Sequence, residues 1–304
     1  MNLYDQQKKN LGNTRLFIAF FVVLLALMGL GADGLLYAGG FSPGIPFATL
    51  GAIAFGGMSA WWSLREGDKA VLQSTGAIPL DRNDPKQRVL DNVVEEIAIA
   101  GGIPKPAVYV VPDSDPNAFA TGVGPERASI AVTRGLLDTL DRDELQGVVG
   151  HELSHVRNYD ILTTSIAATL AAAITYLGTM ARWGMIFGGM RDEEDNRGGG
   201  LISVLLLAFL APLAAMLLQL MVSRRRESAA DETGARLVGH PYGLISALEK
   251  LGAYNKQIPM AASPAASSLY IVKPLSGDGF AGLFSTHPPL EERIAALKQM
   301  VITR

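Results

Sequence analysis

Long uncharged stretches interrupt the chain, and four of them are long enough to cross a bilayer, which takes about 20 apolar residues. They lie at about 16–36, 45–64, 161–181 and 201–222, the first reaching residue 36 if Asp33 sits at the far interface. A buried core helix can account for one such stretch, but four are typical of a membrane protein. The pattern therefore predicts an N-terminal transmembrane hairpin in 1–64 and a second transmembrane hairpin in 161–222.

Positive charge is concentrated beside three ends of these stretches. It precedes the first stretch, follows the second and follows the fourth, at Lys8, Lys9, Arg15, Arg65, Lys69, Arg224, Arg225 and Arg226. The loop 182–200 mixes both signs instead. Because cytoplasmic loops carry the excess of Lys and Arg, both termini are expected in the cytoplasm and 182–200 outside.

The segments 65–160 and 223–304 then share the cytoplasmic side and can form one domain interrupted by the second hairpin. Helical periodicity covers Pro85 to Gly101, with Pro85 in the first turn and Gly101 past the end. Short apolar runs predict strands at Ala107–Val111, Asn117–Thr121 and Ala128–Thr133. Asp141 and Glu144 form a capping pair that opens another helix, which can continue toward the third stretch. The expected fold is a mainly α membrane protein with an α+β cytoplasmic domain and a small β-sheet.

Composition supports a membrane protein and removes several other classes. Only 18% of the 304 residues are charged, against roughly 25% in soluble domains, and the mean hydropathy is +0.24. A net charge of -3 gives no basic field for nucleic acid. The chain has no cysteine, which excludes disulfides, thiolate metal sites and thiol catalysis. Any metal must be held by carboxylates and the four histidines, His151, His155, His240 and His287.

Residues 150–160 read GHELSHVRNYD and fall on the helix that follows the capping pair. His151 and His155 are four apart, so they share one helix face and can bind one Zn²⁺. Glu152 then lies beside the metal, where it can take a proton from the attacking water. The motif predicts a zinc site with Glu152 as general base.

Such a site needs a third protein ligand, and no third histidine follows at metzincin spacing. Residues 223–231, SRRRESAAD, place Glu227 and Asp231 on one helical face directly after the fourth stretch. Glu227 can be the ligand and Asp231 an acceptor for a ligand histidine. Spacing alone leaves open a solvated juxtamembrane segment in which Glu227 pairs with an arginine.

The chain resembles the HtpX family of membrane zinc metallopeptidases in three features taken together. These are HExxH at 151–155, an inserted transmembrane hairpin and SRRRExxAD at 223–231. The segments NAFATG (117–122) and STHPPLEERI (285–294) are also similar to that family. The resemblance runs from the first stretch to about residue 297. Ser228 departs from it, because a larger side chain is expected after the ligand glutamate.

The resemblance implies a zincin-like endopeptidase of gluzincin type, with one Zn²⁺ per chain held by His151, His155 and Glu227. It also implies quality control of misfolded membrane proteins under stress, in the plasma membrane of a prokaryote. A CAAX-type prenyl-peptide protease is the nearest alternative, but four spans are few for its intramembrane chamber. A non-catalytic adaptor stabilised by zinc is the other alternative, and the intact Glu152 disfavours it.

Three further residues are candidates for the site. Similar proteases have a histidine near the active site at the place of His287, which can stabilise an oxyanion or be an ordinary loop histidine. Arg293 can accompany it or form a surface ion pair with Glu291 or Glu292. Asn117 begins a segment that can be the edge strand on which an extended substrate is laid, or an ordinary edge strand.

The remaining polar residues in these motifs carry no predicted chemistry. Asp160 is expected to cap or end a juxtamembrane helix, and His240 follows Gly239 in a turn. The arginines 224–226 are expected to contact anionic lipid head groups.

Overall fold

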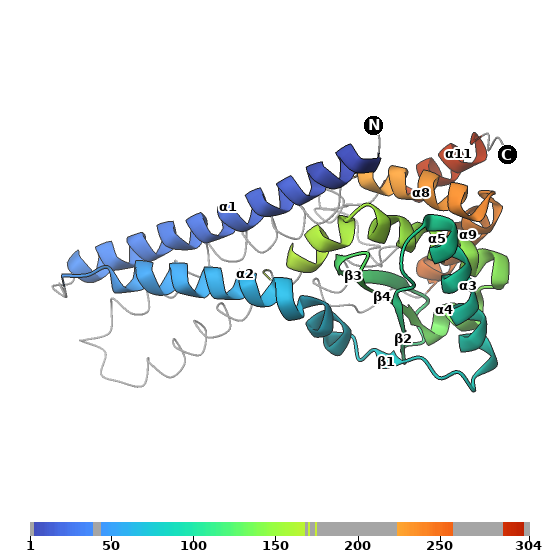
Figure 1. Cartoon of the computed structure of the whole chain (residues 1–304), viewed down its shortest axis with the longest axis horizontal. Coiled ribbons are helices and arrows are strands. Elements are labelled where there is room, and N and C mark those ends of the chain that lie inside the picture. Colours follow the sequence, from blue (N-terminus) through green and yellow to red (C-terminus); the bar gives the residue numbers. More distant parts are fainter. Residues whose placement is uncertain are drawn as a thin grey trace.

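A computed structural model describes residues 3–38, 44–167, 170, 174, 224–257 and 288–300. The chain begins with two long antiparallel helices, α1 (Leu3–Ala38) and α2 (Phe47–Ser74). They project away from the rest of the molecule as a hairpin (Figure 1). Within the described residues, only α1 has a segment long and apolar enough to span a membrane, Asn10–Gly34. The second predicted stretch falls on α2, the third is described only at 161–167, 170 and 174, and the fourth lies outside the described residues. The spanning of all three stays a prediction.

The tip of this hairpin explains how Asp33 is accommodated at the end of an apolar stretch. Its carboxylate accepts hydrogen bonds from the backbone N–H groups of Ala48 and Thr49, both at 2.9 Å, and from the Thr49 hydroxyl at 2.6 Å. Those N–H groups belong to the first turn of α2, which has no partner within its own helix. Gly29 lets the helices approach, because a Cβ there would lie 2.5 Å from the Thr49 Cα.

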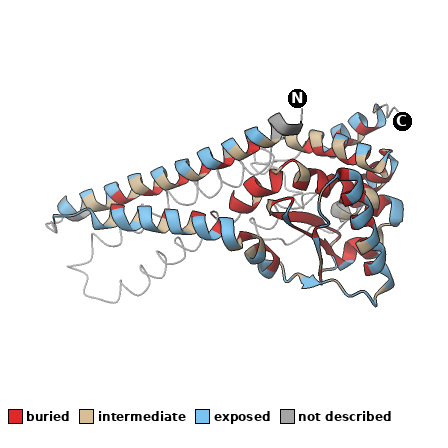
Figure 2. Ribbon diagram, viewed as in Figure 1, coloured by how far each residue is buried: buried red, intermediate tan, exposed pale blue. Residues whose placement is uncertain are grey.

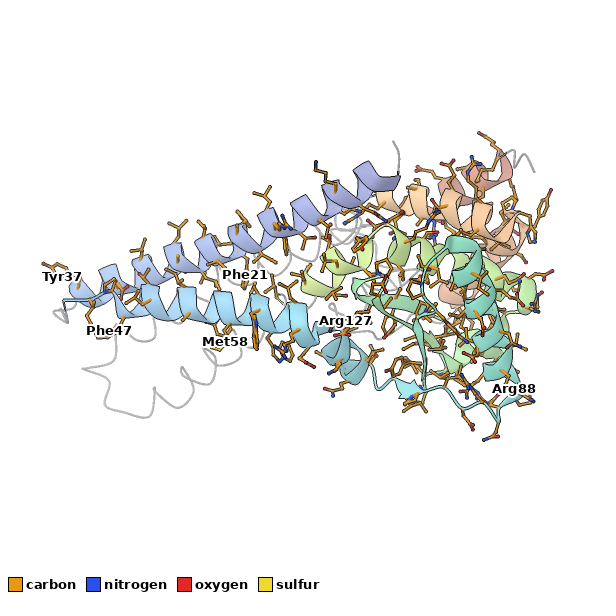
Figure 3. The ribbon with its side chains drawn as sticks, in the orientation of Figure 1. Phe21, Tyr37, Phe47, Met58, Arg88 and Arg127 are labelled. Carbon is orange, nitrogen blue, oxygen red and sulfur yellow. The ribbon has the colours of Figure 1, made fainter. Side chains whose placement is uncertain are left out.

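The outer surface of the hairpin is apolar. Leu16 and Leu27 on α1 and Met58 and Trp61 on α2 are more than half exposed, and Figure 2 shows exposed residues along both helices. Figure 3 shows Phe21 directed between α1 and α2 and Met58 directed away from α1. Such a surface is expected to face lipid or other apolar helices rather than water.

The second part of the structure is a small mixed sheet with helices on both faces. Its strands are β1 (Ile78–Pro79), β2 (Ala107–Val111), β3 (Ala118–Gly124) and β4 (Arg127–Thr133), in the order β1-β2-β4-β3. β2 and β4 are parallel, and the other two pairs are antiparallel. β3 is therefore an edge strand. The described helices of this part are α3 (Pro85–Gly101), α4 (Arg134–Thr139), α5 (Arg142–Arg157), α8 (Arg224–Val238), α9 (Tyr242–Gln257) and α11 (Leu290–Lys298).

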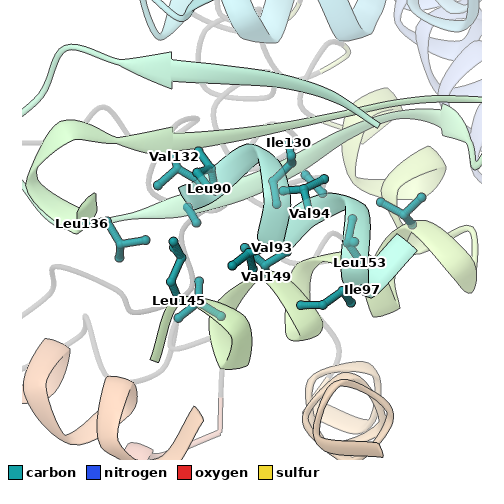
Figure 4. Close-up of a cluster of buried hydrophobic side chains, with 14 of the residues drawn as sticks. Leu90, Val93, Val94, Ile97, Ile130, Val132, Leu136, Leu145, Val149 and Leu153 are labelled. Atoms are coloured by element: carbon teal, nitrogen blue, oxygen red, sulfur yellow. The ribbon is translucent and has the colours of Figure 1, made fainter. Parts of the chain in front are cut away.

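Alternate residues of β2, β3 and β4 enter two different cores, as the period of two in a strand requires. Ile130 and Val132 of β4 pack against α3 and α5 with Leu90, Val149 and neighbouring side chains (Figure 4). On the opposite face, Ala131 and Phe119 pack against side chains of α1, α2 and the helical segment 160–167. The sheet thus joins the N-terminal hairpin to the helices that carry the HExxH motif.

Most predicted boundaries of this part are confirmed, and the differences are local. The helix at Pro85 includes Gly101, and Gly102 is the left-handed residue that ends it, at φ 63°. β3 begins one residue later than predicted and runs to Gly124. β1 and α4 were not predicted, because a two-residue strand and a six-residue helix are too short to show a period. The helix after Asp141 does not continue toward the third stretch, since it ends at Arg157.

Candidate metal centre

Helix α5 carries the HExxH motif and is anchored at its start. The predicted capping box is confirmed, with Asp141 accepting from the Glu144 N–H and Glu144 from the Asp141 N–H. Glu144 also accepts hydrogen bonds from Ser246 and Lys250 of α9. Burial alone would raise the pKa of Glu144, but these partners outweigh it and lower that pKa. This end of α5 is therefore fixed to α9, two turns before His151.

Helix α8 lies directly against α5 because glycines face each other at the crossing. A Cβ on Gly234 would lie 2.7 Å from the His151 nitrogen and 2.8 Å from the Gly150 carbonyl carbon. No ordinary side chain fits into this space. The close contact places the first turn of α8, with Glu227, beside the histidines of α5.

His151, His155 and Glu227 converge in the structure. Their candidate ligand atoms all lie within 4.8 Å of one another, and each histidine Nε2 lies 3.6 Å from an oxygen of Glu227. Zinc bonds of 2.0–2.1 Å in a tetrahedron separate ligand atoms by about 3.3 Å, so the observed spacing nearly matches a zinc site. Two imidazoles and one carboxylate are also a donor set that zinc accepts. The residues present fit a zinc ion.

The second nitrogen of His151 is held by a buried ion pair. Its Nδ1 lies 2.8 Å from Asp231 Oδ1, and Arg293 donates two hydrogen bonds to Asp231, at 2.7 and 2.8 Å. Arg293 is 4% exposed, so the alternative of a surface pair with Glu291 or Glu292 is wrong. A carboxylate on the far nitrogen of a ligand histidine fixes its tautomer and ring orientation.

The second nitrogen of His155 faces a carboxylate that was not predicted to take part. His155 Nδ1 lies 3.1 Å from Asp160 Oδ2. Asp160 is only five residues away, and the two meet because the chain turns at Asn158 and Tyr159, where Tyr159 has φ 60°. The next helical segment starts at Asp160. Asp160 therefore does begin a helix, but its side chain is directed at the site.

Burial and charge act in opposite directions on the pKa values of these groups. Burial lowers the pKa of His151, but the hydrogen bonds to Asp231 and Glu227 outweigh it and raise the pKa to about 9. Burial would raise the pKa of Asp231, but Arg293 outweighs it and lowers that pKa to about 2. The Asp231 carboxylate is therefore ionised at neutral pH beside the imidazole that it orients.

Glu152 is buried beside the three converging residues, with 5% of its surface exposed. Burial raises its pKa, while the neighbouring His151 and His155 and, to a smaller extent, the backbone N–H of Ala120 on β3 act in the other direction. A carboxylate with a raised pKa is suited to accept a proton and release it again near neutral pH. The contact also places Glu152 at the edge strand.

The structure separates the remaining candidates. Asn117 is buried directly before β3, and its Nδ2 has no hydrogen-bond partner within the described part of the chain. His240 lies apart in the turn before α9, where its ring stacks on Tyr242 at 5.9 Å. His287 lies outside the described residues, so its role stays a prediction.

Comparison with known proteins gives a consistent result. The family model described as peptidase family M48 matches residues 84–301 of this chain. A protease HtpX homolog of Desulfatibacillum aliphaticivorans is 48% identical over 254 residues, covering 84% of this chain and 80% of its own. One from Aquifex aeolicus is 43% identical over 297 residues, covering 96% and 92%. The crystal structure of S. mikatae Ste24p is similar in fold at 20% identity, with a TM-score of 0.50, over 93% of this chain and 66% of Ste24p.

Proposed function

The chain belongs to peptidase family M48, and we propose that His151, His155 and Glu227 hold one Zn²⁺ per chain, with Glu152 as general base. Membership in this family and the similarity to the HtpX homologs identify the chain as a membrane-bound bacterial metalloendopeptidase that acts on polypeptides. The observation that carries the assignment of residues is the convergence of two imidazoles and a carboxylate within 4.8 Å. Each imidazole also has a carboxylate at its other nitrogen, as ligand histidines usually do.

Zinc bound at these residues would polarise the peptide carbonyl and lower the pKa of a water molecule. Glu152 is placed to accept the proton of that water and to deliver it to the amine that leaves. Its burial and raised pKa suit both steps. Asp231 and Asp160 keep the two imidazoles turned so that each Nε2 faces Glu227.

The substrate is proposed to lie along the free edge of β3. Asn117 exchanges backbone and side-chain hydrogen bonds with Thr133 of β4. Residues alternate along an antiparallel pair, so the backbone groups of Ala118 and Ala120 face the free edge. An extended polypeptide added there would pass Glu152, which already contacts the Ala120 N–H. Asn117 Nδ2, which has no hydrogen-bond partner within the described part of the chain, is proposed to bind a substrate carbonyl at the start of this edge.

The domain organisation and cellular role extend this proposal. We infer four membrane spans, with 161–222 inserted as a hairpin between the zinc motifs and the active site in the cytoplasm. The apolar outer surface of α1 and α2 supports a bilayer around the hairpin. Substrates are proposed to be misfolded membrane proteins, degraded under stress in a bacterial plasma membrane. His287 and Arg293 are proposed to assist, Arg293 through Asp231.

Purified full-length protein is expected to cleave casein, to lose this activity on zinc chelation and to regain it when Zn²⁺ is restored. The physical reason is that the metal would act as the Lewis acid that polarises the peptide carbonyl and lowers the pKa of the attacking water. Cleavage is measured on labelled casein, with zinc content determined in parallel. Undiminished cleavage by protein shown to be free of metal would contradict a metal-dependent mechanism.

Cysteine labelling is expected to place residue 196 outside and residue 83 inside. The native chain offers no background thiol, and Asn83 is exposed in the turn before α3. Single cysteines at Asn196 and Asn83 are probed in intact cells with an impermeant thiol reagent, and permeabilised cells serve as the control for reactivity. Labelling of residue 83 alone in intact cells would place the active site outside and overturn the cytoplasmic assignment.

A further inference from the structure

One face of α1 contacts the last residue of α5 and the segment that follows it, about 150 residues later in the chain. Gln7, Asn10 and Thr14 are spaced by three and four residues, so they lie on one side of the helix. Each makes a hydrogen bond of 2.8 Å to this part of the chain, at the Arg157 carbonyl, the Asn158 carbonyl and the Thr163 hydroxyl respectively. The N-terminal end of α1 therefore packs on the chain just beyond HExxH, while its other end lies far from the protease part (Figure 1).

Asn10 differs from the other two because it also contacts a side chain of the metal centre. Its Nδ2 donates to Asp160 Oδ1 at 2.8 Å, while Asp160 Oδ2 faces His155 Nδ1. Asn10 is 7% exposed and Asp160 2%. A continuous series of buried hydrogen bonds thus leads from α1 through Asp160 to a histidine of the site.

The two bonds of Asn10 lie on either side of Tyr159. Tyr159 has a positive φ, which is uncommon for a residue with a side chain and is kept only when its surroundings fix it. One amide group binds the carbonyl before Tyr159 and the carboxylate after it. Asn10 therefore fixes the turn in the conformation that directs Asp160 toward His155.

His151 is also oriented by a carboxylate that a distant residue holds, but the donor there is charged. Asp231 at His151 is held by the guanidinium of Arg293, from α11. Asp160 at His155 is held by a neutral amide, from α1. Each imidazole is thus oriented by a carboxylate, and each carboxylate is held by a donor from a distant part of the chain.

We propose that Asn10 is a positioning residue of the metal centre, which orients His155 through Asp160 and makes α1 part of the active site as well as a membrane anchor. This inference rests on the proposed function, because it takes His155 as a metal ligand. Without the Asn10 amide, Asp160 is free to turn away, and His155 loses the partner that fixes its tautomer and its ring.

The test measures the zinc affinity of full-length protein by competition with a chromophoric chelator, together with the melting temperature of the metal-free protein. Asn10→Ala is expected to weaken zinc binding about tenfold, at the low end of the 10–100-fold range for groups behind a ligand. Asn10→Leu keeps a similar volume without a donor and is expected to do the same. Thr14→Val, one turn away on the same face, is expected to change the affinity by less than about twofold.

A double-mutant cycle separates positioning from general loosening of α1. In an Asp160→Ala background, Asn10→Ala is expected to cause no further loss of zinc affinity, although it can still lower the melting temperature. Equal loss in both backgrounds, unchanged affinity in both Asn10 variants, or the same loss in Thr14→Val would each overturn the inference. If Asp160→Ala binds zinc weakly and the Asn10 variants bind it normally, the inference about Asn10 is overturned and the proposed function stands. If the wild-type protein binds no zinc, the proposed function is overturned as well.

Discussion

Glu152→Gln is expected to abolish most peptide cleavage while leaving the metal in place. Glutamine keeps the size of the side chain and can still meet the Ala120 N–H, but it cannot accept and return a proton. General acid–base groups contribute about 10²–10⁴-fold to rate, so a loss of that size is expected in kcat. The three converging donors, His151, His155 and Glu227, do not include Glu152, so zinc content should stay near that of the wild type. Casein cleavage and elemental analysis on the same preparation measure both quantities.

Glu249→Gln is a matched control for this substitution, because Glu249 is an exposed glutamate of α9 paired with Lys298. It should leave both cleavage and zinc content unchanged. Near wild-type cleavage by zinc-loaded Glu152→Gln would remove the general-base role from Glu152. Loss of zinc together with activity would instead show that Glu152 contributes to binding the metal.

Local sequence signals were sufficient to predict the helices and strands that hold the site. The apolar period in 85–101, the run AVYVV and the Asp141–Glu144 capping pair are each confirmed in the structure. All three act within one element, where propensity, capping and period agree. The spacings in HExxH and in ExxxD likewise place each pair on one helix face, without any knowledge of how the helices pack.

Contacts between distant elements could not be predicted in this way. The meeting of Glu227 with the histidines depends on the close approach of Gly150 and Gly234, which are 84 residues apart and show no pattern in the sequence. Asp160 was expected to cap or end a helix and to have no role in the chemistry, and its contact with His155 was not predicted. That contact depends on the positive φ of Tyr159, which nothing in the sequence indicates.

Glu227→Ala is expected to lower zinc affinity by more than about 100-fold, and Asp231→Ala by about 10–100-fold. Glu227 is the residue whose oxygens face both Nε2 atoms, so its loss removes one bond to the metal. Asp231 contacts His151 only at Nδ1, so its loss frees the ring and leaves the ligand present. It also removes the two hydrogen bonds that the buried Arg293 donates to Asp231, which should lower the melting temperature of Asp231→Ala as well.

Glu232→Ala provides the matched control on α8, because Glu232 is exposed and pairs with Arg236, one turn later on the same helix. Its zinc affinity should equal that of the wild type. Chelator competition on all three variants gives the order, and the metal-free melting temperature shows whether each one folds. Normal zinc affinity in folded Glu227→Ala would transfer the role of third ligand to another residue. His287 would then be the next candidate, because it is the one further histidine in the segments that resemble the HtpX family.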